Sequence, residues 1–215
     1  MTSEHDGDRP APEAMRRFRR VAASFATGVV VVTTLDDDVP LGTTVNAFTT
    51  VSLDPTMLLV CLGHGSRLLP GIEHSGVFAA TVLAAEQLPQ ARWFANKQRP
   101  TGMTAFAGVP SRPAPATGCL LLTEGLAYFD CQVRELYPGG DHAVVLGEVL
   151  ACGELSPGDP LLFVGGGYHA VDPRGPIRGR RPGRRAGHGV AAPVDSSSGA
   201  GRSTSANAWS VTTRR

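Results

Sequence analysis

The chain has 215 residues, a length typical of one well-buried domain, and 42% of its residues are hydrophobic while 18% are charged. No apolar run approaches the roughly 20 residues that a membrane-spanning helix needs, and the polar, acidic N-terminus lacks the hydrophobic stretch of a signal peptide. We therefore expect a globular, cytoplasmic protein and exclude an integral membrane protein.

The net charge of +1 is the sum of two segments with opposite net charge. Residues 1–172 contain 11 basic and 18 acidic side chains, a net charge of −7, whereas residues 173–215 contain nine arginines against Asp195, a net charge of +8. The second segment is rich in Arg, Gly, Pro and Ser and has little apolar surface to bury, so we expect it to be disordered. The pattern predicts one domain over residues 12–172, preceded by a disordered N-terminus over residues 1–11.

The first predicted element is an amphipathic helix over residues 12–27, in which apolar side chains recur every three or four residues until Gly28 ends it. β-Branched runs then predict buried strands. The first of these strands covers residues 29–34, a threonine-rich partner strand lies within 40–55, and a third strand covers 57–62. A short helix with Ser66 as its N-cap follows, then a strand over 77–83 and a helix over 86–94. After a loop-rich stretch over 96–118, we expect a hairpin of strands over 126–137 and 142–152 and a last strand over 160–164.

About seven strands with only brief helices, and no regular alternation of strand and helix, favour a mainly β barrel over a doubly wound sheet. Several familiar sites are missing from the sequence: we find no dinucleotide-binding glycine motif, no phosphate-binding P-loop and no nucleophile elbow. His64 and His74 have no carboxylates at ligand spacing, so we expect no metal site.

Four cysteines occur at irregular intervals without a Cys-x-x-Cys pair. Cys61, Cys131 and Cys152 lie inside apolar, strand-like runs, where a free cysteine behaves as a small hydrophobic residue. We expect buried thiols for these residues and for Cys119, and neither a disulfide framework nor a zinc site.

Residues 40–55 place four threonines, an asparagine and a serine among apolar residues. Such a segment lines a groove with hydroxyls and backbone amides while its other face stays in the core. This composition suits a ligand with a phosphate, sugar-like hydroxyls and a ring with hydrogen-bonding edges. The candidate donors are Thr43, Thr44, Asn46, Ser52, Ser66 and Arg67, and the candidate apolar wall is Val45, Phe48 and Leu62.

A series of motifs over residues 12–171 resembles the short-chain flavin reductases that serve two-component monooxygenases. The motifs are Phe18-Arg19, residues 25–29, the run 42–55, Ser66-Arg67, residues 106–110, Gly140-Asp141-His142 and residues 161–168, in that order. One departure is Val164 to Gly167, where several relatives have an arginine or histidine before the final Gly-x-Tyr.

The resemblance implies a split β-barrel homodimer that binds FMN or FAD in a groove near the subunit interface. It implies reduction of the flavin by NADH or NADPH and delivery of the reduced flavin to a separate oxygenase. The implied flavin-binding residues are Thr43, Thr44, Val45, Asn46, Ala47, Phe48, Ser52, Cys61, Leu62, Gly63, Ser66 and Arg67. His142 is the implied catalytic residue that orients the nicotinamide, with Gly140, Asp141 and Tyr168 beside it.

Each implied role has a structural alternative. Thr43 and Thr44 are also ordinary strand residues, Arg67 is also compatible with a surface position, and Asp141-His142 with turn polarity. Two other functions stay open: an electron carrier that holds FMN tightly without oxidising NAD(P)H, and a binding module whose basic tail contacts nucleic acid or an acidic protein. We consider nucleic-acid binding the least favoured.

Overall fold

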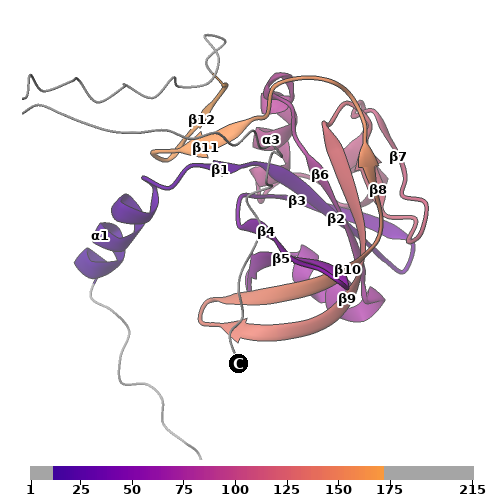
Figure 1. The fold of residues 1–215 in the computed structure, drawn as a ribbon, viewed down its shortest axis with the longest axis horizontal. Coiled ribbons are helices and arrows are strands. Elements are labelled where there is room, and N and C mark those ends of the chain that lie inside the picture. Colours follow the sequence, from indigo (N-terminus) through magenta and orange to yellow (C-terminus); the bar gives the residue numbers. More distant parts are fainter. Residues whose placement is uncertain (1–11, 172–215) are drawn as a thin grey trace, which may run out of the picture. The chain divides into compact units, whose positions relative to one another are not determined.

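The computed structural model describes residues 12–171, so the predicted disordered segments 1–11 and 173–215 lie outside the described residues, as does Asp172. The described chain is mainly β, with short helices between strands (Figure 1). Its strands are β1 (Thr27–Gly28), β2 (Val30–Asp36), β3 (Val39–Val45), β4 (Phe48–Leu53), β5 (Thr56–Gly63), β6 (Val77–Val82), β7 (Ser111–Pro113), β8 (Leu120–Leu122), β9 (Ala127–Gly139), β10 (His142–Glu154), β11 (Leu162–Val164) and β12 (Gly167–His169). Its helices are α1 (Pro12–Ala22), α2 (Leu68–Ser75) and α3 (Leu88–Ala95), with 3₁₀ turns η1 (Ala85–Gln87) and η2 (Gly102–Phe106).

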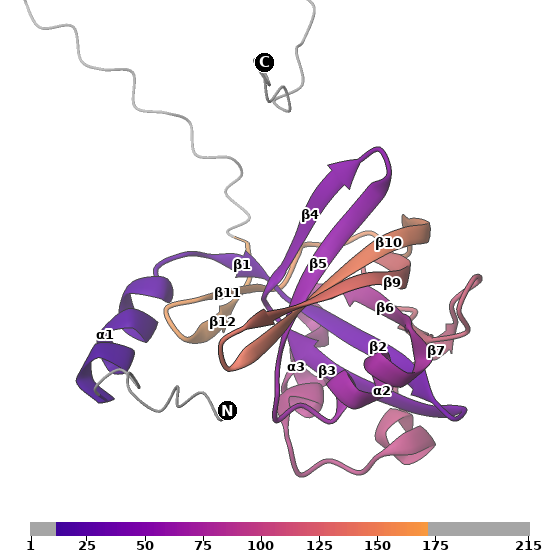
Figure 2. The same ribbon diagram turned by 90° about the horizontal axis from the view of Figure 1, so that it is seen from below.

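Seven strands form one antiparallel sheet in the order β3-β2-β6-β9-β10-β5-β4. The two edge strands, β3 and β4, follow each other in the chain and are joined only by Asn46 and Ala47. The two edges of the sheet therefore meet at this corner, as they do when a sheet curls toward a barrel. Figure 2 shows the β4-β5 hairpin beside the β9-β10 hairpin, to which β5 pairs.

Two apolar cores lie on the two faces of β2, because successive side chains of a strand point to opposite faces. Val30 and Val32 belong to one core, and Val31 belongs to the other. The helix α2 covers the first core with Leu68, Leu69 and Ile72, and α3 covers the second with Ala91 and Phe94. The helices that follow β5 and β6 are thus held against the sheet by their apolar faces.

The helix α1 ends at Ala22, five residues earlier than the predicted helix, and a short strand follows at Thr27–Gly28. The predicted apolar face exists, yet no residue of α1 is buried. Phe18 is 73% exposed, and Phe25, which follows the helix, is 77% exposed. A backbone hydrogen bond of 2.7 Å from Gly165 N to Ala23 O ties the end of this segment to the β11-β12 turn.

Two further predictions need correction. The short helix begins at Leu68 and its N-cap is Arg67, whereas Ser66 Oγ accepts a hydrogen bond from Leu68 N at 3.2 Å. Among the four cysteines, all free, Cys119 and Cys131 are buried as expected, Cys61 is half-buried and Cys152 is exposed. Cys152 lies in the C-terminal half of β10, where every second side chain is exposed. Because successive side chains of a strand point to opposite faces, the apolar run there did not imply burial.

Within residues 12–171, no helix has the length and apolar character needed to cross a membrane.

Candidate active site

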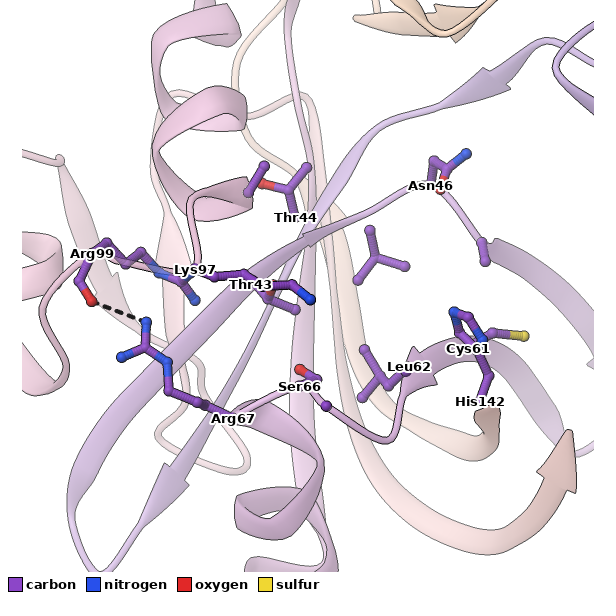
Figure 3. Close-up of a pocket in the computed structure, with 15 residues that line it drawn as sticks. Thr43, Thr44, Asn46, Cys61, Leu62, Ser66, Arg67, Lys97, Arg99 and His142 are labelled. Atoms are coloured by element: carbon purple, nitrogen blue, oxygen red, sulfur yellow. Dashed lines mark hydrogen bonds between the residues drawn. The ribbon is translucent and has the colours of Figure 1, made fainter. Parts of the chain in front are cut away.

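A pocket of about 440 Å³ lies where β3, β5, the start of α2, the loop after α3 and the start of β10 converge (Figure 3). A cavity of this size is within the range of small-molecule sites. Its lining residues are Thr43, Thr44, Val45, Asn46, Ala47, Cys61, Leu62, Gly63, Gly65, Ser66, Arg67, Ala95, Lys97, Arg99 and His142.

The threonine-rich strand β3 is fixed against α3 by its hydroxyls. Thr44 Oγ1 donates to Ala91 O at 2.7 Å, and Thr43 Oγ1 donates to Phe94 O at a longer 3.4 Å. The proton of the Thr44 hydroxyl is therefore used inside the protein, and its oxygen remains as an acceptor only. The predicted role of Thr44 in binding flavin stays a prediction.

Gly42, just before these threonines, lies in a tight environment. A β-carbon at Gly42 would lie 3.1 Å from ring carbons of both Phe94 and Phe106. The two rings are themselves in contact, with centroids 5.1 Å apart. Glycine at this position lets β3 approach the aromatic pair beneath the pocket.

His142, the first residue of β10, pairs with Gly63, the last residue of β5. Its Nδ1 lies 2.7 Å from Asp141 Oδ1, and the hydrogen bond and charge of His142 lower the pKa of Asp141 below its usual range. An ionised Asp141 accepts the proton of Nδ1–H, which directs Nε2 away from the carboxylate. A β-carbon at Gly63 would lie 3.7 Å from Nε2, an ordinary van der Waals contact, so Gly63 and the imidazole are direct neighbours in the pocket wall.

The opposite end of the pocket is positively charged. Arg67, Lys97 and Arg99 line it, and no aspartate or glutamate is among the described lining residues. Arg67 Nη2 donates to Arg99 O at 2.9 Å. Ser66 adds a hydroxyl next to Arg67. Such an end attracts a phosphate, whose oxygens accept charge-assisted hydrogen bonds. Figure 3 shows the cations at one side and His142 with Cys61 at the other.

Most predicted site residues converge on this pocket, and some do not. The structure brings together Thr43, Thr44, Val45, Asn46, Ala47, Cys61, Leu62, Gly63, Ser66, Arg67 and His142. The following residues do not line it: Phe48, Ser52, Gly140, Asp141 and Tyr168.

Each of these five residues has another position. The Phe48 ring packs 5.5 Å from that of Phe129 and borders an adjacent groove. Ser52 Oγ accepts a hydrogen bond from Asp54 N in the β4-β5 turn. Tyr168 packs on Phe163 and reaches a small cleft that Thr44 and Asn46 also border. Gly140 has φ of 73° in the β9-β10 turn. The Asp141 carboxylate contacts His142, and the Asp141 carbonyl accepts a hydrogen bond from His64 N.

Sequence reasoning missed Gly65, Ala95, Lys97 and Arg99. The only signal for the two cations was a pair of basic residues directly after a predicted helix, in a stretch interpreted as loop. Their place beside β3 depends on how α3 packs against β3, which a sequence pattern does not specify.

Comparisons with known proteins show the family of this chain. Residues 22–172 match the family described as flavin reductase like domain. The chain is 39% identical over 174 residues to HsaB, the reductase subunit of a flavin-dependent monooxygenase from Rhodococcus jostii, a match covering 80% of this chain and 87% of that protein. It is 38% identical over 172 residues to the NADH-dependent FMN reductase AsuE2 of Streptomyces nodosus subsp. asukaensis, covering 78% of this chain and 90% of that protein.

A solved structure resembles the fold as well. The NADH:FAD oxidoreductase SgcE6 of Streptomyces globisporus, in complex with NAD and FAD fragments, aligns with a TM-score of 0.70 and 33% identity. The alignment covers 78% of this chain and 98% of that chain. The chain therefore belongs to the flavin reductase family, and the predicted family and mainly β fold are confirmed.

Proposed function

We propose that this protein is an NAD(P)H:flavin oxidoreductase that supplies reduced flavin to a separate oxygenase component. Relatives that match over most of their length are named as reductase components or as NADH-dependent FMN or FAD reductases, and the predicted activity agrees with them. The observation in this chain that carries the proposal is the pocket itself, with cations at one end and His142 at the other.

The pocket residues fit a flavin by their chemistry. Arg67, Lys97 and Ser66 suit its phosphate, Asn46 and the backbone amides of the β3-β4 corner suit the polar edge of its ring, and Leu62 offers an apolar surface. A bound flavin would supply the ring atom N5 that accepts a hydride from the nicotinamide. The protein's part is to hold the two rings together and to exclude competing reactions.

His142 is proposed to orient the nicotinamide. Its imidazole lies at the pocket wall, fixed through Nδ1 by Asp141, and its Nε2 is available to a substrate amide. Hydride transfer from the nicotinamide to the flavin requires no acid or base from the protein. Positioning is therefore the contribution that we expect of this side chain.

The test is NADH and NADPH oxidation by the purified protein, followed with added FMN and with added FAD. We expect oxidation that depends on added flavin, and a decrease in rate of about tenfold to a hundredfold in the His142→Ala variant. His64→Ala, in an exposed neighbouring loop, serves as the matched control. Tightly held flavin without nucleotide oxidation would contradict the proposal and favour the electron carrier.

The flavin form, the nucleotide and the cellular location belong to the same proposal. Named relatives use FAD or FMN with NADH, and we propose that this pocket accepts a phosphate-bearing flavin together with NADH or NADPH. The cytoplasmic location stays a prediction.

We further propose that the protein acts as a homodimer. A second, apolar groove of about 650 Å³ lies between the α1 segment and the β4-β5 hairpin. Phe18 and Phe25 border one side, and Phe48 and Leu59 border the other. Asn46, Ala47 and Cys61 line both this groove and the flavin pocket. A second copy seated here would therefore cover apolar side chains and lie next to the flavin site.

A further inference from the structure

Arg99 is held in place by three contacts although it lies in the loop after α3. Its Nη1 donates to Asn96 O at 2.8 Å, and its Nη2 donates to Gly42 O. Its guanidinium carbon lies 5.6 Å from the centre of the Phe94 ring, within cation–π range. Only 9% of Arg99 is exposed. The side chain is thus a fixed, nearly buried cation at the pocket wall.

The described part of the protein provides no countercharge for Arg99. The ion pairs found within residues 12–171 involve His74, Arg134 and His142, and none includes Arg99. The neighbouring charge is another cation, Arg67. Burial and the charge of Arg67 lower the pKa of Arg99 below its usual value. A buried charge without a partner is costly, so this environment favours an anion supplied from outside.

Arg99 also positions Arg67. Its backbone carbonyl accepts the Arg67 Nη2 hydrogen bond at 2.9 Å, and its side chain holds the Gly42 carbonyl at the start of the threonine-rich stretch of β3. A guanidinium has five N–H donors, and the contacts above account for two of them. Further donors therefore remain for the oxygens of a phosphate.

We propose that Arg99 is a specificity-determining residue that makes the pocket select flavins with a phosphate over a flavin without one. The proposal rests on the proposed function and assigns the discrimination to this one side chain. The Arg99 side chain contributes its own charge, and the Arg99 backbone carbonyl, which the variants below keep, holds Arg67 beside it. Lys97, an exposed side chain at the same end, adds attraction without comparable orientation.

The experiment compares FMN, FAD and riboflavin, which lacks the phosphate. Dissociation constants are measured without nucleotide by quenching of flavin fluorescence, for the wild type and for Arg99→Met and Arg99→Lys. Arg112→Met is the matched control, because Arg112 also lies over an aromatic ring, 5.4 Å from the centre of Tyr128, outside the pocket.

We expect Arg99→Met to weaken FMN and FAD binding by roughly tenfold to a hundredfold, as for a lost hydrogen bond to a charged group, with little change for riboflavin. Arg99→Lys keeps the positive charge but loses the paired N–H donors of the guanidinium. We therefore expect an intermediate loss of FMN and FAD affinity. Arg112→Met should leave all three dissociation constants unchanged.

Equal weakening of FMN and riboflavin in both Arg99 variants would overturn the inference, because it would indicate a structural role alone. Unchanged FMN affinity would overturn it as well. Turnover distinguishes failure of this inference from failure of the proposed function. If the wild type oxidises NADH with FMN, and the Arg99 variants keep the wild-type preference for FMN over riboflavin, only the role of Arg99 is refuted. If Arg99→Met does not fold, the ratio of the FMN dissociation constant to the riboflavin dissociation constant is compared between Arg99→Lys and the wild type, and this comparison decides.

Discussion

At the scale of single residues, a few polar contacts determine what the pocket can offer. The Thr44 hydroxyl donates its hydrogen bond to Ala91 O of α3, whereas Asn46 and Ser66 line the pocket with side chains that can hydrogen-bond a ligand. Asp141 bonds one imidazole nitrogen of His142, and we propose that the other contacts the substrate. The same type of contact, a histidine held by aspartates, occurs outside the pocket and allows a pH-dependent prediction.

His74 at the end of α2 links this helix to the β2-β3 turn. Its Nδ1 lies 2.8 Å from Asp36 Oδ1 and its Nε2 lies 3.9 Å from Asp37 Oδ1. The hydrogen bond to Asp36 and the charges of Asp37 and Asp36 raise the pKa of His74 above its ordinary 6.5. The stabilisation is therefore fully present below the ordinary pKa and is lost as the pH rises through the raised pKa.

We predict that His74→Gln lowers the melting temperature slightly at about pH 6 and has a smaller effect at about pH 9, because the pair is exposed and its charge is lost at high pH. The measurement is thermal unfolding at both pH values. His64→Gln, an exposed histidine without an ion pair among the described residues, is the control. A wild-type advantage that grows with pH would refute the assignment.

At the scale of elements, the long hairpin of β9 and β10 organises the sheet. Its register shifts between Leu146 and Gly147 and again between Val149 and Ala151. Beside the first shift, Phe78 of β6 packs over Gly147. A β-carbon at Gly147 would lie 2.6 Å from two ring carbons of Phe78. The glycine therefore lets the fully buried Phe78 ring of the first core lie close to β10.

We predict that Gly147→Ala lowers the free energy of unfolding by about 1–3 kcal/mol, the usual cost of overpacking a core. Chemical denaturation measures this value. Gly28→Ala is the matched control, because a β-carbon at Gly28 would meet nothing within 4 Å.

The double variant Gly147→Ala with Phe78→Leu separates the cause. The smaller side chain gives the new methyl group room, so the combined loss should be less than the sum of the single losses. Strict additivity would show that the Phe78 ring is not what Gly147 accommodates.

At the scale of the whole molecule, the described residues leave apolar surface next to the proposed flavin pocket. Phe18, Phe25 and Leu59 border the groove between the α1 segment and the β4-β5 hairpin. Val51 and Leu53 on β4 add further exposed apolar side chains. A stable dimer buries roughly 1,200–2,000 Å² in total, and this groove with α1 offers a contiguous region on which such an interface can form.

We predict that the protein is a dimer at micromolar concentration and that Phe18→Asp converts it to a monomer, because a charge in an apolar interface is left unpaired. Light scattering during gel filtration measures the mass. Met103→Asp is the matched control, since Met103 is an exposed apolar residue on η2 outside the groove. A wild type that elutes as a monomer would contradict the homodimer.

Flavin affinity gives the dimer prediction a second readout. Because Asn46 and Ala47 line both the groove and the pocket, we expect the Phe18→Asp monomer to bind flavin more weakly than the wild type. Equal affinity in monomer and dimer would show that the pocket does not need the partner.

Local patterns in the sequence determined much of this protein. The valine run at Val29–Val32, the alternation over β9 and β10 and the Gly140-Asp141-His142 turn predicted strands and a hairpin that the structure contains. The ordered motifs predicted the flavin reductase family, and most of the residues predicted for the flavin site line one pocket. These features depend on propensity and short-range spacing, which a sequence displays directly.

Only the tertiary structure decided which side chains share the pocket and which lose their donors to the protein. Packing of α3 against β3 brings Arg99 to Gly42 and engages the Thr44 hydroxyl. Ser52 lies instead on β4, where its hydroxyl bonds Asp54 N in the β4-β5 turn. The helix α1 has no buried residue, although its sequence predicts an amphipathic helix. The reason is physical: contacts between segments 40 to 60 residues apart depend on how whole elements pack, and local residue patterns carry no information about that geometry.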